Sequence, residues 1–268
     1  MTTLVHDPTD NHPDMATLRE VCQPPETLGR RNAEHWAGPL YLRRASIHVT
    51  RWLLPTNISA NGVTWVMVVV GLVGAACLMW GSVWGAVLAM LGMQLQILLD
   101  CSDGEVARWR QQFSPAGVYV DRIAHYTTEA ALPIALGVRA DGGLGSLGGW
   151  TTVGALLAVL VLLIKAETDL VHVARAFAKR PLMSDDAATA APRAGLVATL
   201  RRTAHSLPFN RAFVSIEFSL LALAAAVVDQ AFGGGLDATR WLVILLVPAA
   251  LVTVTGHLAS IVLSSRLR

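Results

Sequence analysis

The chain has 268 residues, of which 53% are hydrophobic and 15% are charged, and its formal net charge is +2. Soluble domains carry roughly a quarter of their residues as Asp, Glu, Lys or Arg, so this composition excludes an ordinary soluble domain and favours a membrane protein. The small net charge gives no indication of nucleic-acid binding, and the basic residues are better explained by contact with anionic lipid head groups. Three scattered cysteines exclude a disulfide framework.

The first 60 residues are predicted to precede the membrane domain. Residues 1–25 mix Pro, Asp and Thr without sustained periodicity, so we expect residues 1–37 to form a flexible cytosolic segment. Residues 38–60 are expected to form an amphipathic helix and a linker, with the helix lying in the membrane interface. Its apolar residues Leu40, Ile47, Trp52 and Leu54 alternate with Arg43, Arg44 and Arg51. A direct guide for a lipid substrate is the alternative role for this helix.

Residues 61–268 are predicted to form a six-helix transmembrane catalytic domain. Four segments of about twenty residues or more contain no Asp, Glu, Lys or Arg. A helix of about twenty apolar residues is long enough to cross the hydrocarbon core of a bilayer. The four segments are residues 62–81, 81–99, 143–164 and 241–265. Two further apolar segments, 116–138 and 212–232, contain ionisable residues, which in a spanning helix normally face a polar interior. The expected fold is therefore all-α and polytopic, with six transmembrane helices.

Basic residues predict the orientation of these helices. All of the 21 Lys and Arg residues except Arg139 and Arg240 lie in the N-terminal segment, in the regions around the second and fourth connections, or near the C-terminus. Because Lys and Arg near the ends of spans concentrate on the cytoplasmic side, we expect both termini to be cytoplasmic.

The second predicted span ends in the sequence QILLDCSDGEVARWR. Intervals of three and four residues place two acids and two small residues on one helix face: Asp100, Asp103, Gly104 and Ala107. Arg108 follows directly, and its forked guanidinium group suits phosphate oxygens. The small residues would allow a ligand or a facing helix to approach closely.

The third predicted span begins with SPAGVYVDRIAHYTTE, where four polar or small residues recur at intervals of four: Gly117, Asp121, His125 and Glu129. The two helix faces can converge. Neighbouring carboxylates resist ionisation unless a cation lies between them, and oxygen ligands suit Mg²⁺ or Mn²⁺. One aspartate alone would be interpreted as a helix cap, but the combined set predicts a site for metal and pyrophosphate.

The full pattern, Asp-x2-Asp-Gly-x2-Ala-Arg-x8-Gly-x3-Asp, resembles the signature of the CDP-alcohol phosphotransferase family, which continues with x3-Asp. Every position matches except the last, where this chain has His125. The resemblance also covers the Pro-Thr-Asn and Asn-Gly-Val-Thr sequences before the first span and the expected number of helices.

Members of that family transfer a substituted phosphate from a CDP-linked donor, such as CDP-diacylglycerol, to an alcohol and release CMP. The resemblance implies an enzyme with two Mg²⁺ or Mn²⁺ ions between the diphosphate and Asp100, Asp103 and Asp121. It implies contacts with the CDP part from six residues: Asn61, Thr64, Gly104, Ala107, Arg108 and Gly117. It also implies membrane lipids as partners and association of two copies as a homodimer. The basic residues that follow Asp100 and Asp103 place the expected active site on the cytoplasmic side.

His125 stands where the family has an aspartate that binds metal and is the proposed base. A neutral imidazole can bind metal, and its ordinary pKa of about 6.5 also suits general-base chemistry. Glu129, one turn further, could orient the ring or replace the missing carboxylate. The expected catalytic group is thus Asp121, His125 and Glu129, and the alternative is that His125 marks a member without activity.

The acceptor alcohol is not defined by the sequence. Lys165, Arg175 and Arg211 lie near the cytoplasmic ends of the fourth and fifth predicted spans and could contact it, or could anchor the helices at the interface. Two functions remain: an enzyme of phospholipid or related phosphodiester synthesis, and an inactive relative or cation-coupled transporter. A transporter would place its acids near mid-bilayer between broken helices, whereas Asp100 and Asp103 lie where a span meets a basic loop.

Overall fold

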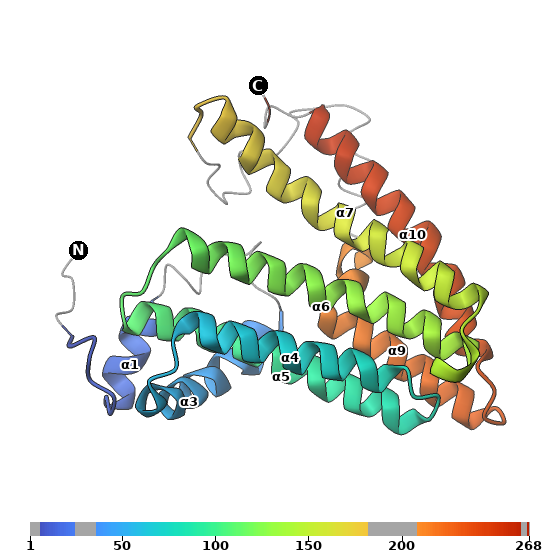
Figure 1. Cartoon of the computed structure of the whole chain (residues 1–268), viewed down its shortest axis with the longest axis horizontal. Helices are drawn as coiled ribbons and strands as arrows, with labels where there is room; N and C mark the ends of the chain where they lie inside the picture. The colour runs from blue at the N-terminus through green and yellow to red at the C-terminus, as the bar shows by residue number, and fades with distance from the viewer. Residues whose placement is uncertain (1–5, 25–35, 182–207, 264–266, 268) are drawn as a thin grey trace. The chain divides into compact units, whose positions relative to one another are not determined.

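A computed structural model describes residues 6–24, 36–181, 208–263 and 267. Within these ranges the regular elements are all helices, so the all-α prediction is confirmed for the described chain (Figure 1). The long helices are α4 (Ala60–Leu78), α5 (Val83–Trp109), α6 (Pro115–Asp141), α7 (Gly149–Phe177), α9 (Ser215–Ala231) and α10 (Asp237–Val262). The shorter ones are α1 (Met15–Cys22), η1 (Gly38–Leu42), α3 (Arg43–Leu53), η2 (Leu54–Thr56), η3 (Leu144–Ser146) and η5 (Pro208–Phe213).

Four of the described helices, α4, α5, α7 and α10, are long and apolar enough to cross a membrane, with mean hydropathy between 1.5 and 2.2 in their most apolar windows. They correspond to the four uncharged segments of the sequence, and they make the chain an integral membrane protein. The two charged segments are also helical, as α6 and α9. However, α9 has only 17 residues and α6 carries several charges, so the count of six spans stays a prediction.

Local capping explains where several helices begin. Ser114 precedes α6, and its hydroxyl accepts a hydrogen bond of 3.0 Å from the Gly117 amide, while Pro115 occupies the first helical position. Asp141 accepts hydrogen bonds from the Gly148 and Thr151 amides, both at 2.7 Å, and so caps the start of α7. These side chains satisfy amides that a helix leaves without partners in its first turn.

The chain forms two compact units. The first comprises Met1–Leu72 and Gly92–Thr127, and the second comprises Val73–Leu91 and Thr128–Arg268. The first unit contains α1, α3 and the adjoining parts of α4, α5 and α6, so it holds the acidic signature. The division of the sequence at residues 37 and 60 stays a prediction.

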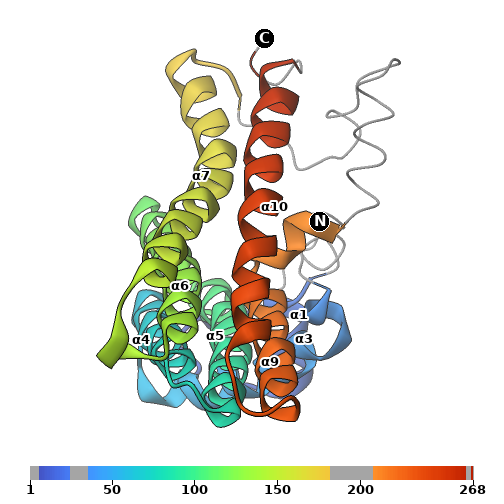
Figure 2. The same cartoon turned by 90° about the vertical axis from the view of Figure 1, so that its right-hand side faces the viewer.

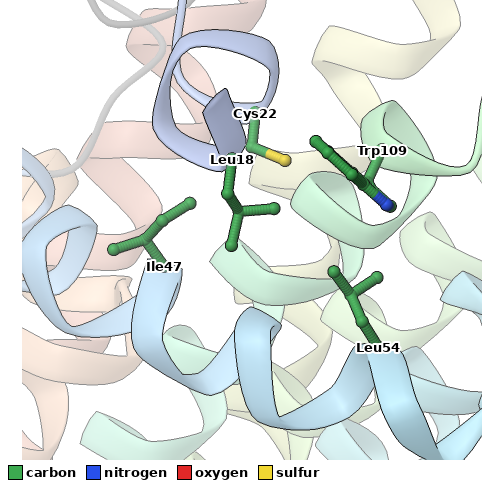
Figure 3. Packing of buried hydrophobic residues seen from close by; sticks show 5 residues of the cluster. All are labelled: Leu18, Cys22, Ile47, Leu54 and Trp109. Atoms are coloured by element: carbon green, nitrogen blue, oxygen red, sulfur yellow. The ribbon is translucent and has the colours of Figure 1, made fainter. Parts of the chain in front are cut away.

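A buried cluster in the first unit joins α1, α3, η2 and the end of α5. It consists of Leu18, Cys22, Ile47, Leu54 and Trp109 (Figure 3). Asp14 caps α1 by accepting from the Ala16 and Thr17 amides, and burial raises the pKa of the Cys22 thiol to about 12. The sequence of residues 1–25 does not indicate this helix, because a helix of eight residues with one buried stripe is too short to produce a periodic pattern. Residues 25–35, also assigned to the flexible segment, lie outside the described residues.

The predicted amphipathic segment is helical as η1 and α3. Its inner face buries Ser46, Ile47 and Thr50, while the Trp52 side chain is 78% exposed. This two-sided character is what an interfacial helix requires, and its location in the membrane interface stays a prediction.

In the second unit, α10 packs beside α7 and α9 (Figures 1 and 2). Arg139 is 1% exposed, and its guanidinium group donates to the carbonyl oxygens of Trp80 and Ser82 at 2.7 and 2.9 Å. A buried cation is tolerated only with such partners, so Arg139 fixes the connection between α4 and α5.

The close approach of α6 and α7 depends on Gly154. A Cβ atom at this position would lie 2.5 Å from the Pro133 carbonyl oxygen and 2.9 Å from the Gly137 Cα atom. We expect Gly154→Ala to destabilise the fold by about 1–3 kcal/mol through overpacking, measured as a lower midpoint of thermal unfolding in detergent. Gly256→Ala in α10 is the matched control, because nothing lies within 4 Å of its added Cβ atom. Equal unfolding midpoints for the two variants would contradict the prediction.

Candidate active site

Asp100, Asp121 and His125 come together in the first unit. One ligand atom from each residue lies within 4.8 Å of the others. Asp100 is on α5, whereas Asp121 and His125 stand one turn apart on α6. The Nε2 atom of His125 is 2.9 Å from Asp100 Oδ1 and 3.5 Å from Asp121 Oδ1. The two helices therefore bring these three side chains together.

The chemistry of these three residues fits a divalent cation. Two carboxylates and an imidazole supply oxygen and nitrogen ligands, and opposite ligands of an octahedral Mg²⁺ ion lie roughly 4 Å apart. The three side chains are between 24% and 39% exposed, so solvent and a substrate can reach them. The group could hold one ion after small side-chain adjustments.

Asp103 lies outside this group of three. It is 9% exposed, and its Oδ2 atom accepts a hydrogen bond of 2.6 Å from the Thr64 hydroxyl on α4. The structure thus pairs a predicted metal ligand with a residue that was predicted to face the nucleotide. The role of Asp103 as a metal ligand stays a prediction.

Four of the six residues predicted to contact the CDP part form two close pairs. A Cβ atom on Gly117 would lie 3.2 Å from Asn61 Oδ1, so the missing side chain allows α6 to approach the start of α4. A Cβ atom on Gly104 would lie 3.4 Å from a terminal nitrogen of Arg108, which places the guanidinium group over this glycine. Ala107 lies between Gly104 and Arg108 in the sequence, and its side chain is partly buried.

Glu129 and the predicted acceptor residues belong to the second unit. Glu129 is 3% exposed and forms an ion pair of 2.9 Å with Lys165 Nζ. Arg175 donates from Nε to the Pro181 carbonyl oxygen at 2.9 Å, and Arg211 is exposed in η5. The proposed roles of Glu129 toward His125 and of these basic residues toward an acceptor stay predictions.

Two further acids have partners that the sequence does not predict. The sequence offers Glu167 only as a possible part of an acceptor pocket, and it does not single out Glu105. Glu167 on α7 lies 2.9 Å from His257 on α10. Glu105 is completely buried, in a variable position between Gly104 and Ala107 of the signature. The sequence does contain an indication that Glu105 has buried partners, because an ionisable residue inside an apolar helix requires them.

The profile of the CDP-alcohol phosphatidyltransferase family matches residues 52–254. The chain therefore belongs to this family of enzymes, which transfer a phosphatidyl group from a CDP-alcohol to an acceptor and generally use divalent metal ions. A search among individual curated proteins finds none that matches the chain. The matched residues include the whole acidic signature, whereas α1 and most of α3 precede them.

Proposed function

We propose that this protein transfers a substituted phosphate from a CDP-linked donor, such as CDP-diacylglycerol, to an alcohol in the synthesis of a phospholipid or a related phosphodiester. The convergence of Asp100, Asp121 and His125 in a member of this family is the observation that carries the proposal. The acceptor oxygen forms a bond to the donor phosphorus, the bond from that phosphorus to CMP breaks, and the hydroxyl proton passes to a base.

The geometry favours different roles for His125 and Asp121. His125 turns Nε2 toward both carboxylates, and the single lone pair of this nitrogen cannot bind a metal and accept a proton together. A carboxylate has two oxygens and can do both. We therefore assign His125 as a metal ligand and Asp121, the most exposed of the three, as the group that accepts the hydroxyl proton.

Divalent ions bound here would neutralise the diphosphate and stabilise the charge on the leaving CMP. Arg108 adds a fixed positive charge, and its terminal nitrogens can contact the diphosphate. Lys165, Arg175 and Arg211 remain the proposed contacts of the acceptor. The distribution of Lys and Arg supports a cytoplasmic active site and cytoplasmic termini, and a homodimer remains part of the family-based proposal.

A cation-coupled transporter is the competing function. Such proteins build their sites from interrupted helices near the bilayer midplane. Here α5 continues as one helix from Val83 to Trp109, past Asp100 and Asp103. This continuity favours an enzyme whose acids lie near the end of a span.

CMP release by the purified protein tests the proposal. CDP-diacylglycerol and other CDP-alcohols would be offered with Mg²⁺ or Mn²⁺ and a panel of alcohols. We expect CMP only when donor, alcohol and metal are all present, and we expect a chelator to stop its formation. If no combination of donor, alcohol and metal yields CMP, the protein is not a transferase of this type.

A further inference from the structure

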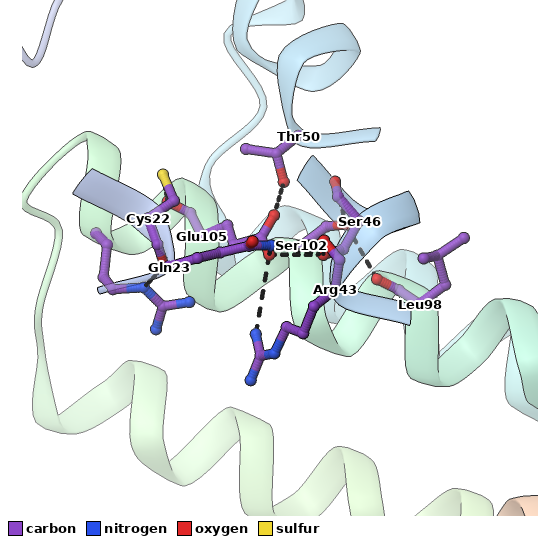
Figure 4. Close-up of polar contacts among 9 residues, drawn as sticks. Cys22, Gln23, Arg43, Ser46, Thr50, Leu98, Ser102 and Glu105 are labelled. Carbon is purple, nitrogen blue, oxygen red and sulfur yellow. Dashed lines mark hydrogen bonds and ion pairs between the residues drawn. The ribbon is translucent and has the colours of Figure 1, made fainter. Parts of the chain in front are cut away.

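Glu105 lies at the centre of a polar cluster in the first unit (Figure 4). Its Oε1 atom accepts hydrogen bonds from Gln23 Nε2 at 2.7 Å and from the Ser46 hydroxyl at 2.6 Å. Its Oε2 atom accepts from the Thr50 hydroxyl at 2.7 Å, and an Arg43 nitrogen lies 3.8 Å from Oε1. Three donors and a cation suit an ionised carboxylate, which could not otherwise be buried at low cost.

This cluster attaches two elements to α5, the helix that carries Asp100, Asp103 and Arg108. Gln23 directly follows α1, whereas Ser46 and Thr50 belong to α3. Further contacts hold the N-terminal segment on the end of α5: Trp109 Nε1 donates to the Asp10 carbonyl oxygen at 2.9 Å, and a His6 ring nitrogen lies 2.8 Å from the Trp109 carbonyl oxygen. Together with the apolar cluster of Figure 3, these contacts hold α1 against the rest of the first unit, and α1 is called docked in this arrangement.

The docked helix also contacts Arg108 of the signature. Arg108 donates from Nε to the Cys22 carbonyl oxygen at 2.6 Å. This carbonyl lies at the C-terminal end of α1, where helix carbonyls lack intrahelical partners and carry partial negative charge. Because Nε is engaged there, the two terminal nitrogens are turned toward Gly104.

We infer that α1 is a positioning element of the donor site: its Cys22 carbonyl orients Arg108 toward the donor diphosphate, and Glu105 holds α1 in the docked position. The inference rests on the proposed function, since it takes Arg108 as a diphosphate contact. It concerns a helix outside the residues that match the family. Docking of α1 and binding of the donor then favour each other, because such coupling is reciprocal.

A double-mutant cycle in the full chain tests this coupling. The combined substitutions Leu18→Ala and Gln23→Ala weaken the docking of α1 without changing a signature residue, and Glu20→Ala on the exposed face of α1 is the matched control. We expect the docking variant to raise KM for the CDP-linked donor about tenfold with kcat nearly unchanged. The control should keep the KM of the parent.

Arg108→Ala supplies the second arm of the cycle. If α1 acts through Arg108, the docking substitutions should raise KM no further in the Arg108→Ala background. The inference would be overturned if the docking substitutions raised KM by the same factor with and without Arg108→Ala. It would also be overturned if the docking variant kept the KM of the parent. Neither result would contradict the transferase activity. A parent that neither releases CMP nor binds CDP would overturn the inference and the proposed function together.

Hydrogen exchange provides a readout that needs no turnover. CDP with Mn²⁺ should slow amide exchange in residues 15–22 of the parent, and the effect should disappear in Arg108→Ala. Protection of α5 by CDP with no change in α1 would show that the helix only stabilises the fold, and would reject the coupling.

Discussion

Asp121→Asn is expected to lower kcat for CMP release by about a thousandfold, because the variant loses both a charged metal ligand and the proposed proton acceptor. Asn keeps the size of the side chain, so the first unit should still fold. Removal of one of two neighbouring carboxylates should leave the thermal midpoint of the metal-free protein unchanged or higher.

The measurement is initial CMP release at saturating donor and acceptor, with thermal unfolding measured in parallel. Asp237→Asn is the matched control, since the Asp237 side chain is 84% exposed at the start of α10. The control should retain the kcat of the parent. An Asp121→Asn variant with the kcat of the parent would remove Asp121 from the mechanism.

His125→Ala is expected to lower kcat by about a hundredfold and to raise the metal concentration needed for half-maximal activity, because the group of Asp100, Asp121 and His125 loses one of its ligands. His125→Asp should keep substantial activity and shift its metal preference toward Mg²⁺, since a carboxylate is a harder ligand than an imidazole. Metal titrations of CMP release with Mg²⁺ and Mn²⁺ would measure both effects.

These two substitutions also separate the readings of His125. Full activity in His125→Ala would show that the histidine takes no part in the reaction. An inactive parent that gains activity as His125→Asp would show that the histidine marks loss of the family chemistry. An active parent with an unchanged metal preference in His125→Asp would contradict the assignment of His125 as a ligand.

The sequence was most informative where structure follows from neighbouring residues. Blocks of uncharged apolar residues predicted α4, α5, α7 and α10, because hydropathy over about twenty residues decides whether a helix can span a bilayer. Spacings of three and four residues placed the acids on helix faces for the same local reason. The segments of α6 and α9 form helices. However, the charges of α6 and the short length of α9 leave it a prediction that these two helices cross the membrane.

The sequence by itself determined the helical class, the membrane character, the family signature and the grouping of Asp121 with His125, since all of these depend on composition or on one helical turn. Only the tertiary structure decided that Asp103 pairs with Thr64, that α1 is docked, and that Glu105 joins residues 23, 46 and 50. The hydrogen bonds of Asp103 and Glu105 alone connect positions 39 to 82 residues apart. Their formation depends on which buried polar groups find partners after the helices pack, and no local pattern specifies that choice.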